Sequence, residues 1–226
     1  MLLFCFFIES SAQPALEHHP NTNRFEIDVD ERFLSGMRGT NQLEDDHVIY
    51  MLRLTGQELT RRSNRVPYPK CIILSPHFLL SSNEMRYDEF IGMGGNLDRC
   101  KVIIPVFIDR YEHWILFQAD LGAKKLSVFD SSAHTLKDKY TDEVDELLGF
   151  LDYFFARMNT KTPRLSVEYP VSPRQTNDYD CGVFVIVNAY ILILNRQLSY
   201  SQNDIPLFRL QIEDMMVEGR FTDFYK

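Results

Sequence analysis

The chain has 226 residues, of which 45% are hydrophobic and 13% aromatic, and its 24 basic and 32 acidic residues give a formal net charge of −8. This length and composition fit one compact domain with its own hydrophobic core and exclude an intrinsically disordered chain. The acidic balance argues against a nucleic-acid partner, because affinity for duplex nucleic acid rests on clustered lysines and arginines.

Residues 1–24 are expected to form an extension ahead of a single domain that spans residues 25–226. Residues 2–8 are apolar (LLFCFFI) and are followed by Ser10, Ser11 and Ala12, which a signal peptidase accepts. The segment lacks the basic start of a signal peptide and is too short to span a membrane. We therefore interpret it as a tail or a misplaced start codon, with secretion as the alternative.

The first elements of the domain combine a helix with a short strand. Apolar spacing predicts a helix over residues 43–54, whose first turn carries Asp45 and Asp46 at its positive end. The basic residues 61–65 (RRSNR) are expected to lie in a solvated loop. A run of β-branched residues at 71–74 predicts a strand.

A small central sheet is expected from the next three runs. Residues 101–108 (KVIIPVFI) form a strand in which Pro105 indicates a sheet edge or a bulge. Residues 113–119 and 125–129 flank a loop that contains Gly122, which is typical of a hairpin. The predicted sheet is therefore mixed or antiparallel.

Two helices are expected in the second half of the chain. Thr141 can cap a helix whose apolar residues recur at helical spacing as far as Met158. After a short strand near residues 165–167, a second helix begins at Cys181 and continues for about 15 apolar residues, too long for a typical strand. The fold class is therefore α+β, with a small sheet flanked by helices.

The cysteines stand far apart, at Cys5, Cys71, Cys100 and Cys181. No pair has Cys-x-x-Cys spacing, so we expect no structural zinc and no other metal. A chain of this size does not need disulfides, and reduced thiols fit the cytosol or the nucleus.

Cys181 is the candidate nucleophile. The N-terminus of a helix carries a partial positive charge, which favours a thiolate. Gly182 beside it removes side-chain bulk where a substrate carbonyl would approach. The alternative, weighted higher on local sequence alone, is an inert buried cysteine.

His113 and Asp130 are the candidate base and its partner. Histidine is the side chain whose pKa suits a base for a thiol, although an exposed loop histidine is the simpler interpretation of His113 alone. Asp130 follows the second strand of the hairpin that carries His113, so the two strand ends can bring these residues together. Gln175, six residues before Cys181, can donate to an oxyanion together with the Cys181 N–H group.

These residues carry a resemblance to a known family. His113-Trp114, Asp130-Ser131, Gln175 and the run Tyr179-Asp180-Cys181-Gly182 occur in an order and at spacings that resemble the ubiquitin-like-protein proteases. These are the sentrin/SUMO-specific and deneddylating cysteine peptidases, relatives of the adenovirus protease. The resemblance extends over about residues 43–220 and implies a papain-like fold.

The resemblance implies His113 as base, Asp130 as its orienting partner, Cys181 as nucleophile and Gln175 in the oxyanion hole. It also implies cleavage after the terminal Gly-Gly of a ubiquitin-like modifier, in a precursor or in a lysine conjugate. Trp114 matches the residue that forms one wall of the narrow tunnel for the glycines. No cofactor is implied, and we expect a monomer in the nucleus or cytoplasm, without a nucleic-acid or membrane partner.

The sequence departs from the family where a second wall tryptophan is usual. Leu43 takes that place, while Asp46 keeps the acid that contacts the modifier in relatives. We therefore expect altered Gly-Gly binding with the chemistry retained. Asp46-His47 and Tyr179 are similar to the deneddylases, but plant and fungal SUMO proteases share the tyrosine, so the modifier stays open.

Three functions compete at this point. The first is a cysteine isopeptidase acting on a SUMO-like modifier, with a deneddylase or deubiquitinase as the alternative substrate class. The second is a catalytically weak, modifier-binding scaffold, which the missing tryptophan motivates. The third is an acetyltransferase of the kind found on related Cys/His folds in bacterial effectors.

Overall fold

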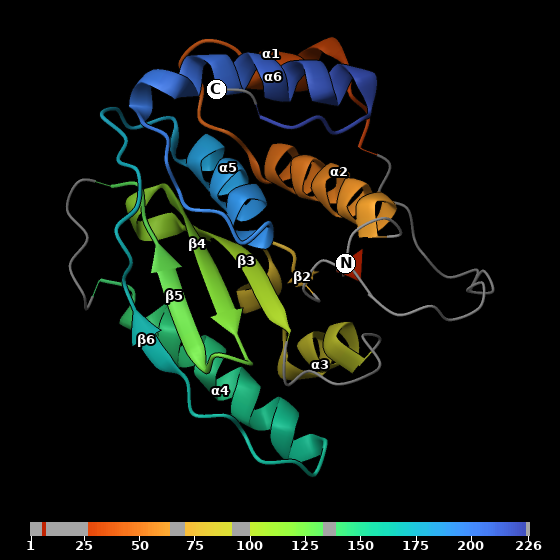
Figure 1. The fold of residues 1–226 in the computed structure, drawn as a ribbon, viewed down its shortest axis with the longest axis vertical. Helices are drawn as coiled ribbons and strands as arrows, with labels where there is room; N and C mark the ends of the chain where they lie inside the picture. Colours follow the sequence, from red (N-terminus) through yellow and green to blue (C-terminus); the bar gives the residue numbers. More distant parts are fainter. Residues whose placement is uncertain (1–5, 8–26, 64–70, 92–99, 133–138, 225–226) are drawn as a thin grey trace.

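A mixed β-sheet forms the centre of the molecule (Figure 1). The computed structural model describes residues 6–7, 27–63, 71–91, 100–132 and 139–224. Within them, the strands lie in sequence order across the sheet: β1 (Phe6–Phe7), β2 (Cys71–Ile73), β3 (Lys101–Ile108), β4 (His113–Asp120), β5 (Lys125–Phe129) and β6 (Ser166–Glu168). The β2–β3 and β5–β6 pairs are parallel, and the other neighbours are antiparallel.

Helices cover both faces of the sheet (Figure 1). On one side, α2 (Asp45–Ser63) and α5 (Cys181–Ile193) lie nearest the strands, with α1 (Glu31–Met37) and α6 (Ile205–Glu218) outside them. On the other side lie α3 (Asn83–Ile91) and α4 (Thr141–Arg157). The fold is therefore the expected α+β arrangement, with a mixed sheet between helical layers.

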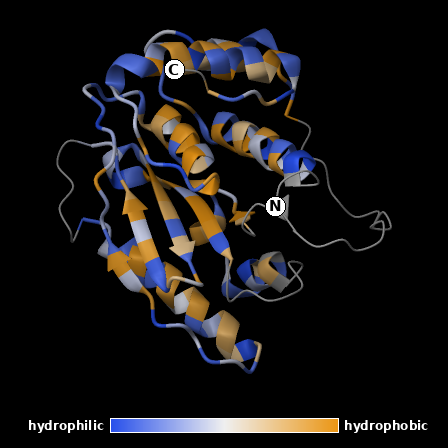
Figure 2. Ribbon diagram, in the orientation of Figure 1, coloured by the Kyte–Doolittle hydropathy of each residue, from blue (hydrophilic) through white to orange (hydrophobic). Residues whose placement is uncertain are grey.

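The alternation of side chains along β4 explains why both faces are covered. Trp114 and Leu116 pack into the core formed with α2, α5 and α6, while Ile115 and Phe117 pack into the core formed with α3 and α4. A strand that is apolar on both faces must be buried on both, because successive side chains point to opposite sides. Figure 2 shows α5 as mainly hydrophobic, and nearly all of its residues are buried.

The predicted strands and the helices α4 and α5 are confirmed. The sheet edge or bulge indicated by Pro105 is not found, because β3 is an interior strand and pairs with β4 without a break from Lys101 to Ile108. β3 lies between β2 and β4. Its pairing with β2 ends at Ile103, two residues before Pro105. Pro105 is still paired with Leu116 of β4. The proline is tolerated in an interior strand because β2 is too short to reach it. No backbone hydrogen bond to β2 is therefore lost through the missing N–H group of Pro105.

Two local predictions are also corrected. Thr141 is the first residue of α4, and the capping position belongs to Tyr140, whose side chain makes no capping hydrogen bond. Arg61 and Arg62 lie in the last turn of α2 rather than in a loop. Both pair with Glu58, one turn earlier on the same helix, and these pairs add to the stability of its last turn. Residues 64 and 65 lie outside the described residues.

The N-terminal extension is described only at Phe6 and Phe7, which form β1 and pair with Ile73 and Ile72 of β2. The expected boundary near residue 24 lies outside the described residues, so the division into an extension and one domain stays a prediction. Within the described ranges, no helix combines the length and the apolar character needed to cross a membrane.

Candidate active site

Three elements of the fold bring His113, Asp130 and Cys181 together. His113 is the first residue of β4, Asp130 directly follows β5, and Cys181 is the first residue of α5. The β4–β5 hairpin places His113 Nε2 2.7 Å from Asp130 Oδ1. The His113 side chain also hydrogen-bonds Cys181. Because Asp130 occupies Nε2, Nδ1 is the ring nitrogen left for the thiol.

The residue before His113 has an unusual backbone conformation. Glu112 adopts the left-handed region at φ 46°, ψ 48°, at the end of a short 3-10 turn formed by Asp109–Tyr111. Such a conformation costs free energy for a residue with a β-carbon and is retained where the surrounding structure requires it. Here it turns the chain directly into β4 at His113.

Asp130 is a fully buried carboxylate held by several donors. Its Oδ1 accepts from the backbone N–H of Ser132 at 2.7 Å, and its Oδ2 accepts from the Tyr140 hydroxyl at 2.7 Å. Lys139 Nζ lies 3.6 Å from Oδ2. Burial alone would raise the pKa of Asp130, but the bonds from His113, Tyr140 and Ser132 lower it to about 2. The carboxylate therefore stays ionised.

The thiol and the imidazole shift each other's charge state. Burial would raise the pKa of Cys181, but hydrogen bonds from His113, Gln42 and the Trp114 backbone outweigh it and hold that pKa below its usual value. Burial would lower the pKa of His113, but its bonds to Asp130 and Cys181 raise it to about 9. This arrangement favours a thiolate–imidazolium pair near neutral pH.

The other described cysteines and histidines have different surroundings. Cys71 and Cys100 are buried thiols that form no disulfide among the described residues, and burial raises the pKa of Cys71 far above its usual value. His47 bonds two backbone groups, and His77 pairs with Asp45. Within the described ranges, no cluster of three or more His, Cys, Asp or Glu side chains could hold a metal ion.

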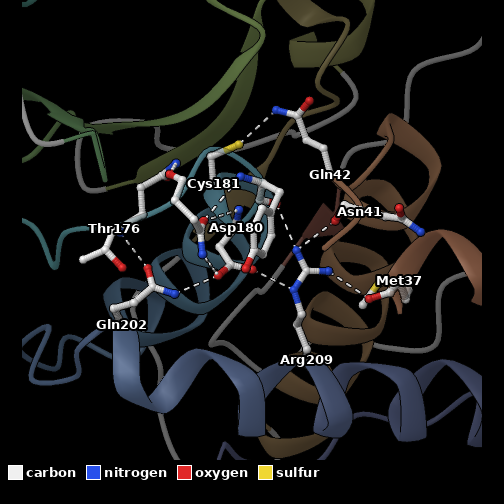
Figure 3. Close-up of polar contacts among 11 residues, drawn as sticks. Met37, Asn41, Gln42, Thr176, Asp180, Cys181, Gln202 and Arg209 are labelled. Atoms are coloured by element: carbon white, nitrogen blue, oxygen red, sulfur yellow. Dashed lines mark hydrogen bonds and ion pairs between the residues drawn. The ribbon is translucent and has the colours of Figure 1, made fainter. Parts of the chain in front are cut away.

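Gln42 is a residue at the thiol that sequence reasoning missed. Its Nε2 lies 3.3 Å from Cys181 Sγ (Figure 3), across 139 residues of sequence, and it also lies 2.5 Å from the Glu112 carbonyl oxygen. No local pattern marks a lone glutamine ahead of a helix. The fold alone makes it a neighbour of the cysteine.

The side-chain amide of Gln175 lies near His113, the candidate base, and both of its polar atoms are hydrogen-bonded. Its oxygen accepts from Ser131 Oγ at 2.6 Å, and its nitrogen donates to the Asn177 carbonyl at 2.7 Å. Gln175 lines a pocket of about 490 Å³ together with His113 and Glu112. The structure thus brings Gln175 to the base, with its described side-chain bonds directed to Ser131 and Asn177.

The three expected substrate-binding residues are placed differently from one another. Trp114 and Leu43 are 1% and 2% exposed, and the Trp114 indole donates to the Leu43 carbonyl at 2.9 Å. Both side chains pack in the core. Asp46 is exposed at the start of α2, and with Leu43 and Gln42 it lines a pocket of about 660 Å³.

Gly182 has a packing role rather than the open approach expected from the sequence. A β-carbon at this position would lie 2.8 Å from Cβ of Leu43, closer than real β-carbons approach. The absent side chain lets the first turn of α5 rest on the segment before α2. Cys181 and Gln42 are neighbours because these two backbones come so close.

The family of the chain follows from comparison with known proteins. Residues 41–220 match the model of the Ulp1 protease family, C-terminal catalytic domain. The chain belongs to this family. The match covers most of the chain, and the resemblance read from His113, Asp130, Gln175 and Cys181 is thereby confirmed at the level of the family.

Curated relatives of this Ulp1-family chain carry protease names. It is 30% identical over 217 residues to "Putative ubiquitin-like-specific protease 1B" of Arabidopsis thaliana, which covers 87% of this chain and 59% of the relative. It is 27% identical over 215 residues to sentrin-specific protease 2 of Rattus norvegicus, a match that covers 89% of this chain and 35% of the relative. The chain therefore spans only part of the length of these relatives.

Solved structures of Ulp1-family domains have the same fold. The SUMO protease Ulp1 with its catalytic cysteine oxidised to a sulfenic acid superposes with a TM-score of 0.71 at 18% identity, covering 87% of both chains. The catalytic domain of the Chaetomium thermophilum Ulp1-like SUMO protease superposes with a TM-score of 0.61 at 22% identity, and the match covers 83% of this chain and 76% of that domain. At these identities the likeness establishes the papain-like fold class.

Proposed function

We propose that this chain is a cysteine protease that cleaves after the C-terminal Gly-Gly of a ubiquitin-like modifier, with a SUMO-like modifier favoured. The observation that carries the proposal is the buried His113 that joins Asp130 on one side and Cys181 on the other. A thiolate next to a charged imidazole, in turn held by a carboxylate, is the arrangement of a nucleophilic cysteine hydrolase.

The proposed reaction has two halves. Cys181 Sγ attacks the carbonyl carbon of the last glycine, and the C–N bond to the leaving amine breaks as His113 gives that amine its proton. A thioester of the modifier on Cys181 remains. His113 then takes a proton from a water molecule, whose oxygen displaces Sγ and releases the modifier carboxylate.

Further residues are assigned as part of the same proposal. Asp130 orients His113, and Gln175 stays a candidate oxyanion donor. The pocket of about 660 Å³ lined by Asp46 and Leu43 is the proposed place for the modifier tail. The carboxylate of Asp46 would pair with a basic residue of the modifier. Trp114 holds Leu43 of this pocket in place through the hydrogen bond from its indole to the Leu43 carbonyl.

The proposed partners are a ubiquitin-like modifier and its lysine conjugates. Solved Ulp1 was captured in complex with Smt3, the yeast ortholog of SUMO, which supports this partner class. We further propose a monomer that acts in the nucleus or cytoplasm without a nucleic-acid or membrane partner, because such modifiers and a reduced thiol belong there.

Activity-based labelling tests the function. SUMO-like, NEDD8-like and ubiquitin modifiers with a C-terminal propargyl group are incubated with the wild type and with Cys181→Ser. We expect at least one probe to attach covalently to the wild type and none to the variant. Labelling that persists in Cys181→Ser contradicts the assigned nucleophile. Modifier binding without labelling or turnover would instead identify a scaffold.

A further inference from the structure

The side-chain amide of Gln42 lies at the point where the candidate nucleophile and base meet. One nitrogen, Nε2, contacts Cys181 Sγ at 3.3 Å (Figure 3) and also contacts the Glu112 carbonyl oxygen at 2.5 Å. A primary amide nitrogen has two hydrogens, so both acceptors can be served at once. The Glu112 carbonyl can only accept, which fixes the amide with its nitrogen toward the thiol.

The residues on either side of Gln42 are held firmly. The carbonyl of Asn41 accepts from Arg209 at 2.9 Å, and the carbonyl of Leu43 accepts from the Trp114 indole at 2.9 Å. The Leu43 side chain is buried against Gly182. Gln42 is therefore fixed to β4, which carries His113, and to α5, which carries Cys181. Such anchoring is what a preorganised donor requires.

The alternative amide at the site is directed elsewhere in this conformation. Gln175 uses its oxygen for Ser131 and its nitrogen for Asn177. Gln42, by contrast, contacts the sulfur directly. Among the side-chain amides of the described residues, it is the one for which a hydrogen bond to Cys181 is found.

We propose that Gln42 is a catalytic residue whose Nε2 donates to the Cys181 thiolate in the free enzyme and to the substrate oxyanion during acylation. This inference rests on the proposed function. As the S–C bond forms, the carbonyl π electrons move to oxygen, so the negative charge passes from Sγ to an oxygen bonded to the attacked carbon. A donor already at Sγ needs little movement to follow that charge.

The proposal is tested with Gln42→Met, which keeps the side-chain length but removes the donor. Gln57→Met on the exposed face of α2 is the matched control, and Gln175→Met is compared in parallel. Turnover is measured with a modifier carrying a C-terminal fluorogenic amide, and the thiol is titrated by its rate of iodoacetamide alkylation against pH. Thermal unfolding checks that each variant folds.

We expect Gln42→Met to lower kcat by about 10²-fold with little change in KM, since one oxyanion donor is lost. We also expect its alkylation profile to move to higher pH, while Gln57→Met matches the wild type in both. A Gln42→Met enzyme with kcat within about threefold of the wild type overturns the proposal. Loss of turnover in Gln175→Met alone would assign the oxyanion to Gln175.

The alkylation measurement separates this inference from the proposed function. If the wild type hydrolyses no modifier, the proposed function fails, yet the thiol titration still reports the contact. An unchanged profile in Gln42→Met then overturns the inference as well. If Gln42→Met unfolds, Gln42→Glu keeps the size and should raise the alkylation pKa further, because its charge opposes the thiolate.

Discussion

Arg209 of α6 and Asp180, the residue immediately before Cys181, form a buried ion pair with 2.7 Å between Nε and Oδ1 (Figure 3). The remaining Arg209 donors reach backbone carbonyls of Met37, Asn41 and Tyr179. One guanidinium thus joins the segment before Gln42 to the segment before Cys181. Asp180 Oδ2 accepts in turn from Asn177 and Gln202.

We expect Arg209→Met to destabilise the fold by about 3–5 kcal/mol, because it leaves the Asp180 carboxylate buried without its cation and three carbonyls without a donor. Urea unfolding at neutral pH measures the loss. Lysine at position 209 keeps the charge but cannot reproduce the planar set of donors, so it should restore only part of the stability.

Arg220→Met is the matched control for this prediction. Arg220 lies just beyond α6, its side chain is 71% exposed, and it pairs with Glu218 at the surface. Exposed pairs contribute little, so we expect a change below about 1 kcal/mol. Equal stability of the two methionine variants would contradict the role assigned to Arg209.

The His113–Asp130 pair could be predicted from sequence because it depends on one hairpin. Two strands separated by a short loop must return to each other, so a histidine at one end and an aspartate at the other come together. The helix starting at Cys181 was similarly predictable from its apolar length. These features need no knowledge of distant parts of the chain.

The contacts of Gln42 and Arg209 depend on how separate elements pack. Gln42 meets Cys181 across 139 residues, and Arg209 meets Met37 across 172. No periodicity in either segment marks these side chains. Pro105 indicates a sheet edge or a bulge from its own strand alone, whereas its tolerance inside the sheet depends on where β2 ends, which is a property of the sheet.

Gly182→Ala tests the close approach of α5 to Leu43. The added methyl would lie 2.8 Å from Cβ of Leu43, so a backbone must shift. We expect a loss of about 1–3 kcal/mol and slower alkylation of Cys181 as its contact with Gln42 opens. In the double variant with Leu43→Ala, the loss of unfolding free energy should be smaller than the sum of the two single losses, because the two residues are in contact.

Gly149→Ala is the control, because a β-carbon there meets nothing within 4 Å on the exposed face of α4. Alanine in a helix interior should stabilise by about 0.5–1 kcal/mol. Thermal and urea unfolding measure both variants. If Gly182→Ala gained stability as Gly149→Ala does, the space between α5 and Leu43 would be large enough for a methyl group, which would contradict the close approach.

Tyr140→Phe removes the hydroxyl that donates to Asp130 Oδ2. We expect a loss of about 1.5–3 kcal/mol at pH 7, because a buried carboxylate loses a donor. The folded-state pKa of Asp130 is lowered to about 2, so its contribution is present above about pH 4 and lost as the pH falls toward 2.

The deficit of Tyr140→Phe should therefore shrink between pH 7 and about pH 3, which urea unfolding at the two pH values measures. Tyr153→Phe is the control, since its hydroxyl accepts from the exposed Arg157. A deficit that is equally large at both pH values would point to lost packing and not to the carboxylate.

Asp130→Asn tests the charge coupling of the site through the pH dependence of kcat/KM. In the wild type, activity should rise as Cys181 loses its proton, below the usual pH for a thiol, and fall as His113 loses its proton near pH 9. Because the bond to Asp130 raises the pKa of His113, its removal should move the alkaline limb to lower pH. It should also lower kcat by about 10²–10⁴-fold, since the imidazole loses its orienting partner.

Asp178→Asn is the control for Asp130→Asn. Asp178 is exposed and lines the pocket beside His113 and Gln175, so its substitution should leave both limbs of the pH profile in place. An alkaline limb that stays near pH 9 in Asp130→Asn would mean that the proton on His113 is held by Cys181 alone.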